Sequence, residues 1–317
     1  MTAQPLVYVH GAGPQKTARD MKQELDLLLF GKDLGSSRVA HYADVRWPPP
    51  AAIAGRQPSG QDSARRAGRN RAVRLAERPQ VSPKAAAAAI VTASLAPGAR
   101  GPQAAVGGIQ RPAAPHETDA LELVEQLYRR ADRIAKRSSA APGGPTAGIS
   151  FPDPIFRRVV GHFASDVVDY LYGEFTERMR APVRQALLTG PQPKVIVAHS
   201  LGTIILYDVL SEPAFQGFDV EMLVTVGCPL GIGNVQDRLR DRAGRPNPVP
   251  PAVKAWANFA DRWDPVALDP TLRNEFTPKE FTKDESVNNP AKNNHDLTGY
   301  LSVGLVGSAI VTAVGPD

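Results

Sequence analysis

The chain has little cysteine and no long apolar run. Cys228 is the single cysteine among 317 residues, so no disulfide can form within the chain, as is typical of proteins from a reducing compartment. The longest apolar runs, residues 85–96 and 301–314, are shorter than the ~20 residues that a membrane-spanning helix needs. The first residues show no basic segment followed by a long apolar one, the pattern of a secretory signal. We therefore expect a cytoplasmic protein without a membrane span.

Acidic residues are scarce in one part of the chain. Residues 51–115 hold ten Lys or Arg against two acids, a net charge of +8, whereas the whole chain carries +5 and the remainder therefore −3. Such a basic segment attracts anionic surfaces, but this one contains no aromatic side chain on which a base could stack. An anionic membrane surface that binds residues 56–84 is therefore a candidate partner, and nucleic acid is not an expected one.

The same part of the chain lacks sustained hydrophobic periodicity. Residues 47–115 are rich in Pro, Ala, Gly and Arg. We interpret them as a flexible insertion, because long segments of this kind within a domain are usually disordered or functional. Two helical patterns, a basic one over residues 64–77 and an apolar one over residues 84–95, leave a lid or a surface-binding segment as alternatives.

The most informative stretch is a strand that turns into a helix within a few residues. Residues 195–198 form a short apolar run with β-branched side chains, which predicts a strand buried on both faces. A helical pattern begins at Thr203. The residues between them are His199, Ser200, Leu201 and Gly202. Because so few residues cannot form an ordinary loop, Ser200 is predicted to hold a strained backbone conformation, which often marks a functional site.

This stretch resembles the nucleophile elbow of the α/β-hydrolase superfamily of serine esterases and lipases. The usual pattern is G-x-S-x-G; here Ala198 replaces the first glycine and Gly202 supplies the second. The resemblance covers residues 5–46 and 155–315. It implies the α/β class, with a mostly parallel central sheet flanked by helices.

Apolar patterns along the rest of the chain fit that fold. We expect helices over residues 17–30, 116–138, 156–188 (interrupted near Gly173 or Pro182) and 296–314, and strands over residues 5–9, 37–45, 220–226 and 252–259. Residues 236–251 and 274–294 are polar and are predicted to be irregular. The expected organisation is a single domain of residues 1–317, with the insertion at 47–115 and a helical cap region at 116–175.

A glycine-rich turn, His10-Gly11-Ala12-Gly13-Pro14, follows the first predicted strand. A Walker A phosphate loop needs glycines where this chain has His10 and Gln15, which disfavours that interpretation. The turn instead resembles the His-Gly turn of lipases and esterases, which supplies a backbone N–H to an oxyanion hole. In that family the residue after His-Gly is the donor, and here that residue is Ala12.

A serine nucleophile needs a base, and the base needs a carboxylate that orients it. The family order is serine, acid, histidine, and His295 is the one histidine after Ser200. The resemblance implies that the acid follows a late strand, where Asp264 and Asp261 are rivals. We favour Asp264, with Asp261 holding the loop, and we expect Asp296 to cap the terminal helix.

The resemblance implies a serine hydrolase that cleaves carboxylic esters, with lipids among the candidate substrates, through an acyl-enzyme. The implied site is the triad Ser200, His295 and Asp264, an oxyanion hole from the N–H groups of Ala12 and Leu201, and supporting motif residues His10, Gly11 and Gly202. No metal or cofactor is expected, and the expected partner is a small-molecule ester or lipid. Two alternatives stay open: a non-catalytic scaffold of the same fold, and a protein that binds anionic surfaces or nucleic acid through its arginines.

Three further residues of reactive type receive structural interpretations. Cys228 is expected to pack at a strand end, because nothing near it in the sequence would lower its pKa. His41 is interpreted as a core or surface histidine. His162 is interpreted as structural or as lining the cap.

Overall fold

The computed structural model describes residues 3–48, 60–95, 116–140, 153–243, 247–278 and 282–316. The chain divides into two compact units: Met1–Trp47 with Glu177–Asp317, which we call the sheet unit, and Pro48–Thr176, which we call the helical unit. Each unit buries apolar side chains of its own.

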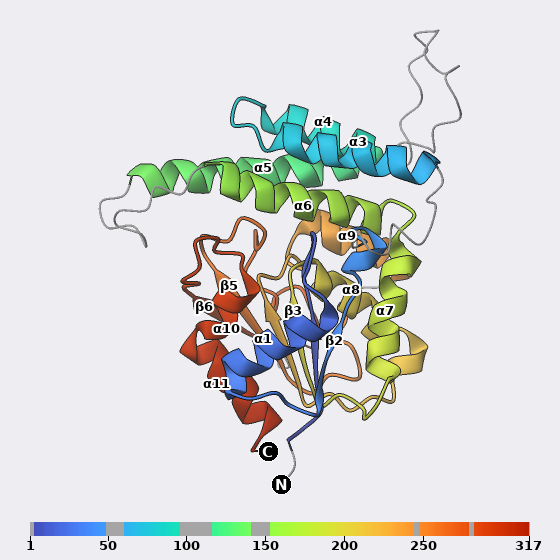
Figure 1. Cartoon of the computed structure of the whole chain (residues 1–317), viewed down its shortest axis with the longest axis vertical. Coiled ribbons are helices and arrows are strands. Elements are labelled where there is room, and N and C mark those ends of the chain that lie inside the picture. Colours follow the sequence, from blue (N-terminus) through green and yellow to red (C-terminus); the bar gives the residue numbers. More distant parts are fainter. Residues whose placement is uncertain are drawn as a thin grey trace. The chain divides into compact units, whose positions relative to one another are not determined.

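Six parallel strands form the centre of the sheet unit (Figure 1). They are β1 (Leu6–Val9), β2 (Ser37–Ala40), β3 (Val195–His199), β4 (Met222–Val226), β5 (Trp256–Asp261) and β6 (Thr282–Val287). Their order is β2-β1-β3-β4-β5-β6, and every pairing is parallel, which confirms the predicted α/β class. The order reverses between β1 and β3, the place at which open α/β sheets bind ligands beyond the carboxyl ends of their strands.

Helices flank this sheet. They are α1 (Ala18–Phe30), α7 (Thr176–Leu188), α8 (Leu201–Leu210), α9 (Gly233–Ala243), α10 (Leu297–Ser302) and α11 (Gly304–Val314). Helix α1 begins as its sequence predicts, because the Thr17 hydroxyl oxygen accepts a hydrogen bond from the N–H of Asp20 at 3.2 Å. It ends at Gly31, whose φ of 68° is easy only for glycine.

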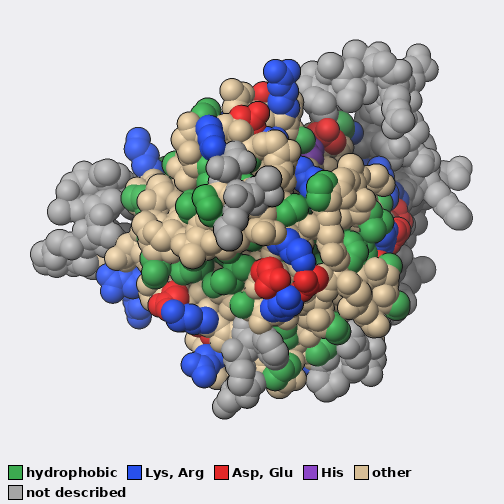
Figure 2. All heavy atoms as spheres, turned by 90° about the horizontal axis from the view of Figure 1, so that it is seen from below, with side chains coloured by type: hydrophobic (Ala, Val, Ile, Leu, Met, Phe, Trp, Pro, Cys, Tyr) green, Lys and Arg blue, Asp and Glu red, His purple; other side chains and the backbone are tan. Residues whose placement is uncertain are grey.

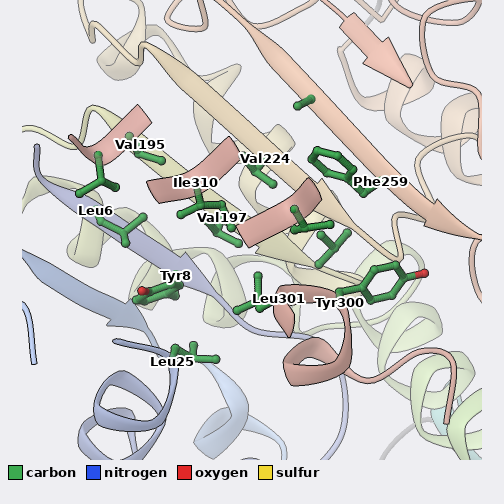
Figure 3. Packing of buried hydrophobic residues seen from close by; sticks show 14 of the residues in the cluster. Leu6, Tyr8, Leu25, Val195, Val197, Val224, Phe259, Tyr300, Leu301 and Ile310 are labelled. Atoms are coloured by element: carbon green, nitrogen blue, oxygen red, sulfur yellow. The ribbon is translucent and has the colours of Figure 1, made fainter. Parts of the chain in front are cut away.

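The main hydrophobic core of the sheet unit lies on one face of the sheet (Figure 3). Side chains alternate along a strand, so Leu6 and Tyr8 of β1 share this face, while their neighbours in the sequence point to the other. Helices α1, α10 and α11 cover the face with apolar side chains, among them Leu25, Leu301 and Ile310. Helix α8 contacts β1 and β3 and lies on the opposite side of the sheet (Figure 1).

The helical unit contains α3 (Gly60–Ala76), α4 (Pro83–Leu95), α5 (Glu117–Ala140) and α6 (Asp153–Leu171). Helices α3 and α4 confirm the two helical patterns inside the predicted insertion, and α4 buries Ala86 and Ile90. The segments 49–59 and 96–115 of that insertion lie outside the described residues.

A buried arginine joins three helices of the helical unit. Arg157 of α6 is 2% exposed, and its Nη1 donates to the carbonyls of Ala76, Arg78 and Val81 at and just after the end of α3. Its Nε and Nη2 donate to both carboxylate oxygens of Asp132 in α5, at 2.9 and 2.7 Å. Because a buried charge must be paired and hydrogen-bonded, this arrangement fixes the packing of the unit.

The arginines of α3 do not form one exposed face. Arg71 and Arg74 are exposed, whereas Arg69 is buried, with its guanidinium carbon 5.2 Å from the ring centroid of Phe175. Among the described helices, none is long and apolar enough to cross a membrane.

One predicted boundary is wrong, and one of the two predicted positions for a helix break is confirmed. The strand predicted over 37–45 ends at Ala40, and residues Ala43–Val45 form a short 3-10 helix instead. The break in the helical region 156–188 falls at Gly173, where a side chain would come within 2.8 Å of the Asp169 carbonyl. Pro182 lies inside α7 without ending it.

Both polar segments predicted to be irregular contain regular structure. Helix α9 begins at Gly233 and buries only a narrow stripe, which includes Val235 and Leu239. Strand β6 is an edge strand that fully buries only Thr282 and Val287, so the strand predicted over 252–259, observed as β5, is not the last. The predicted terminal helix is interrupted at Val303, whose extended backbone separates α10 from α11.

Candidate active site

Ser200 occupies the turn between β3 and α8 in a strained conformation. Its φ of 54° and ψ of −130° place it with His116 as the two non-glycine residues of positive φ in the described ranges. Its N–H donates to the Val226 carbonyl at 3.2 Å, which ties the turn to β4. The strained conformation predicted for Ser200 is therefore present, and strain of this kind persists where the surrounding structure holds it.

Two glycines allow the turn after β1 to lie against this elbow. A side chain at Gly202 would collide with the His10 carbonyl oxygen and would lie 2.9 Å from that of Val9. A side chain at Gly11 would lie 2.9 Å from Cβ of Ser200. Only glycine fits at either position without a shift of the backbone, so both motif glycines are needed for the close approach of the two turns.

Ser200, His295 and Asp264 form a continuous hydrogen-bonded chain. The Ser200 Oγ lies 2.7 Å from His295 Nε2, and His295 Nδ1 lies 2.8 and 2.9 Å from Oδ2 and Oδ1 of Asp264. The three residues are 1, 6 and 0% exposed. An ionised carboxylate can only accept, so a neutral His295 donates from Nδ1 and accepts the serine hydroxyl at Nε2.

Asp264 is held in its charged form. Burial alone would raise its pKa, but the facing His295 and hydrogen bonds from His295, Val266 and Tyr300 outweigh it, and the pKa is lowered. The Val266 N–H and Ala267 N–H both donate to Oδ1, at 2.8 and 3.2 Å, and the Tyr300 hydroxyl donates to Oδ2 at 2.8 Å. The carboxylate therefore faces His295 in a fixed orientation.

Asp261 has a different set of partners. Its carboxylate accepts from the N–H groups of Trp263 and Asn289, at 2.7 and 2.6 Å, and from Nδ2 of Asn294 at 3.1 Å. Burial raises its pKa against the effect of these donors. The structure thus brings Asp264, and not Asp261, to the imidazole, while Asp261 holds the loop that carries it.

That loop is itself braced by asparagines. Nδ2 of Asn289 donates to the carbonyls of Asn294 and Asp296, at 3.1 and 2.8 Å, and the His295 N–H donates to Oδ1 of Asn293 at 2.9 Å. Asp296 caps α10 by accepting from the Gly299 N–H at 2.9 Å, as its sequence position predicts. His295 is therefore held by its neighbours on both sides.

Two buried neutral histidines, His10 and His199, hydrogen-bond the backbone around the site but form no hydrogen bond with the side chains of Ser200 or His295. Burial lowers the pKa of His10 and of His199 to about 3. Nε2 of His199 donates to the His295 carbonyl at 2.8 Å. Nε2 of His10 accepts from the Tyr42 N–H at 3.0 Å, so its Nδ1 donates to the Gly11 carbonyl at 2.7 Å.

The two predicted oxyanion-hole donors come from the two turns that meet at Ser200: Leu201 follows it in the sequence, and Ala12 belongs to the turn after β1. Leu201 is the first residue of α8, where an N–H has no acceptor within its own helix. Ala12 follows Gly11, and its carbonyl accepts from Nε2 of Gln15 at 3.0 Å. Neither N–H donates to another residue in the described ranges.

The remaining reactive side chains lie in structural surroundings. Cys228 is buried, and its thiol donates to Oγ1 of Thr203 at 3.3 Å. Burial raises the pKa of this thiol to about 12, so it is inert as a nucleophile near neutral pH. A ring nitrogen of His41 hydrogen-bonds the Lys16 carbonyl at 2.8 Å, and His162 lies in α6 of the helical unit. No group of three His, Cys, Asp or Glu side chains in the described part of the chain could hold a metal ion.

Sequence reasoning missed the roles of Tyr300, His199 and Asn289. His199 stands inside the elbow motif, but its bond to the His295 carbonyl spans 96 positions of sequence and leaves no local signal. Tyr300 matches an apolar position of the terminal helix, and only its hydroxyl distinguishes it from a core residue. A search for Asn and Asp clusters beside the single late histidine would have indicated Asn289.

Comparison of the chain with known protein families, with curated proteins and with solved structures finds no match. The functional argument therefore depends on the geometry of the site.

Proposed function

We propose that the chain is a serine hydrolase of the α/β-hydrolase type that cleaves carboxylic esters through an acyl-enzyme. The observation that carries this proposal is the buried hydrogen-bonded triad of Ser200, His295 and Asp264. Nε2 of His295 lies 2.7 Å from Oγ of Ser200, and its Nδ1 lies 2.8 Å from Oδ2 of Asp264. It stands after β3, where the strand order reverses and where open α/β sheets place their ligand sites.

In the acylation step, Oγ of Ser200 attacks the ester carbonyl carbon while Nε2 of His295 takes the hydroxyl proton. The imidazolium that results faces the Asp264 carboxylate, which stabilises the new positive charge without taking the proton. The imidazolium then gives the proton to the leaving alkoxide as the C–O bond breaks. An alcohol departs and the acyl group remains on Ser200.

The negative charge that develops on the carbonyl oxygen needs donors that are already in place. The N–H groups of Leu201 and Ala12 are proposed as these donors, since they belong to the two turns that meet at Ser200 and neither N–H has an acceptor among the described residues. A single donor of this kind typically contributes about 100-fold or more to turnover.

Deacylation repeats the chemistry with water as the nucleophile. His295, neutral again, takes a proton from the attacking water, and the Ser200 oxygen leaves with that proton while a carboxylic acid is released. Every proton in the cycle moves through His295 Nε2. The residues present supply this chemistry without a metal or cofactor, and the proposed partner is a small-molecule ester or lipid.

Covalent labelling with a fluorophosphonate probe tests the proposal. The wild-type chain should be labelled and Ser200→Ala should not, because the probe reacts with an activated serine. Ser211→Ala is a matched control, since Ser211 ends the same helix and its hydroxyl only donates to the Tyr207 carbonyl; this variant should be labelled like the wild type.

Two results would contradict the proposal. Labelling that survives in Ser200→Ala would place the reactive group elsewhere. No labelling of folded wild-type protein would favour the second candidate, a non-catalytic scaffold that binds a ligand. Given labelling, turnover of p-nitrophenyl esters of graded chain length would define the acyl group.

A further inference from the structure

One tyrosine hydroxyl joins the two aspartates that follow β5. Tyr300 belongs to α10 and is fully buried, and its ring packs in the hydrophobic core. Its hydroxyl donates to Oδ2 of Asp264 at 2.8 Å and accepts from the Asp261 N–H at 3.0 Å. In Figure 3 this hydroxyl points away from the labelled apolar side chains of the core.

We propose that Tyr300 is a positioning residue, which fixes the Asp264 carboxylate toward His295 and limits its basicity. The inference rests on the proposed serine-hydrolase function and concerns a residue that touches neither the nucleophile nor the base in the described contacts.

The geometry shows why the hydroxyl matters. The Val266 and Ala267 N–H groups hold only Oδ1 of Asp264. Oδ2 is held by Tyr300 and His295 alone. Without the hydroxyl, Oδ2 would be left with His295, the residue that it orients, as its one partner. The carboxylate could then tilt about its Cβ–Cγ bond within the limits set by the two N–H groups on Oδ1.

The helix that carries Tyr300 also couples acid and base mechanically. Helix α10 starts directly after His295, with Asp296 as its cap, and Tyr300 follows one turn later. The phenol anchors that helix to Asp264 and to the start of the loop at Asp261. A displacement of α10 would therefore move both His295 and the Tyr300 hydroxyl that holds Asp264.

The charge of Asp264 predicts the direction in which the pH profile of activity should shift. The titratable groups that face Asp264 are His295, Tyr300, Asp261 and His199. The Tyr300 hydroxyl stabilises the charged carboxylate. A carboxylate that loses this donor attracts the imidazolium form of the base more strongly, so the acidic limb of the activity profile should move to higher pH.

Tyr8 offers a matched control in the same core. Tyr8 of β1 is also buried, and its hydroxyl donates to buried Asp26 at 2.9 Å. Asp26 is bonded to Lys22, Leu34 and Ser37 and has no part in the site. Both tyrosines belong to the one hydrophobic cluster of Figure 3. Tyr300→Phe and Tyr8→Phe therefore remove the same chemical group from similar surroundings.

The experiment measures kcat, KM and the pH profile of ester hydrolysis for the two variants, with thermal unfolding as a check. Tyr300→Phe should lower kcat about tenfold, since hydrogen bonds to charged groups are strong, should leave KM unchanged, and should move the acidic limb upward. Tyr8→Phe should lower the unfolding midpoint but keep kcat and the limb of the wild type.

The inference is overturned if both variants behave alike, or if Tyr300→Phe changes stability only. Should Tyr300→Phe fail to fold, 3-fluorotyrosine at position 300 takes its place in the experiment. Its more acidic hydroxyl donates a stronger hydrogen bond, so the acidic limb of the activity profile should move to lower pH. An unmoved limb would contradict the proposal. A wild type that neither labels nor turns over esters would instead overturn the proposed function.

Discussion

Polar side chains lie beyond both ends of the parallel strands, and they are held differently at the two ends. We call the end that follows the last residues of the strands the carboxyl edge, and the end that precedes their first residues the amino edge. At the carboxyl edge, Ser200, His295 and Asp264 are almost fully buried and joined by directional hydrogen bonds. At the amino edge, Lys254 pairs with Asp219 and Glu221 at 2.5 and 2.8 Å, although these side chains are 55, 42 and 48% exposed. The view from below in Figure 2 shows charged side chains of both signs gathered on the surface.

The two edges differ in how far water reaches their polar contacts. Water screens the amino-edge ion pairs, so their geometry can relax at little cost. At the carboxyl edge the donors and acceptors are paired with one another and shielded from water, where the loss of a hydrogen-bond partner costs more free energy. A substitution should therefore have large effects at one edge and small effects at the other.

The largest effect should come from Asp264. Asp264→Asn keeps the shape of the side chain but lets an amide N–H face the imidazole, which reverses the tautomer that His295 needs. We expect kcat for ester hydrolysis to fall about 10⁴-fold. Asp261→Asn, three residues away, should lower it about tenfold at most, because Asp261 bonds the loop and not the base. A larger loss in Asp261→Asn, measured in the same assay, would reverse the assignment of the acid.

Gly227 tests how tightly the carboxyl edge is packed. Its φ is 55°, and a side chain would lie 2.8 Å from Oδ2 of Asp264 and 3.0 Å from Nδ1 of His295. Gly227→Ala should lower kcat about 100-fold by displacing the pair. Gly31→Ala has a similar φ of 68° but open space around it, so it should cost about 1 kcal/mol of stability and no activity. Equal activity in the two variants would show that the contact is not critical.

The buried histidines predict how stability depends on pH. His10 and His199 protonate near pH 3 when folded, against an ordinary value of 6.5. The unfolded chain therefore binds more protons between these values, and the free energy of unfolding falls as the pH drops below 6.5. The slope should be about 1.4 kcal/mol per pH unit for each histidine. Urea unfolding at several pH values measures it; His199→Gln should reduce the slope, and an unchanged slope would contradict the prediction.

The smallest effect should come from the amino edge. Lys254→Ala removes both ion pairs of that side chain, yet the activity should be that of the wild type and the unfolding midpoint should move less than in Gly31→Ala. High salt should reduce even this difference. A clear loss of turnover in Lys254→Ala would remove the contrast between the two edges.

The buried strands and the core of the site could be predicted from the sequence, because burial and strain leave local signals. The apolar runs of β1, β3 and β4, the elbow at Ser200 and the single later histidine at His295 are visible in the residues themselves. Strand β6 was missed because an edge strand buries only its ends, Thr282 and Val287.

What remained hidden depends on contacts between distant residues. Asp261 and Asp264 stand at the end of the same strand and just after it, so their sequence positions do not decide which of them faces the imidazole. The position of the loop that carries His295 decides it, because Nδ1 of His295 contacts Asp264. Tyr300 has the spacing of a core residue, and its bond to Asp264 spans 36 positions. Polar networks of this kind depend on the whole fold, so no short sequence pattern predicts them.

The most direct test of the account is the covalent intermediate on Ser200. Rapid mixing with p-nitrophenyl acetate, followed by an acid quench and mass spectrometry of the digested chain, should show an initial release of about one p-nitrophenol per active chain. It should also show an added acetyl group on the peptide that contains Ser200. Hydrolysis without this adduct, or an adduct on another residue, would contradict the central claim that the chain Ser200–His295–Asp264 is a working catalytic unit.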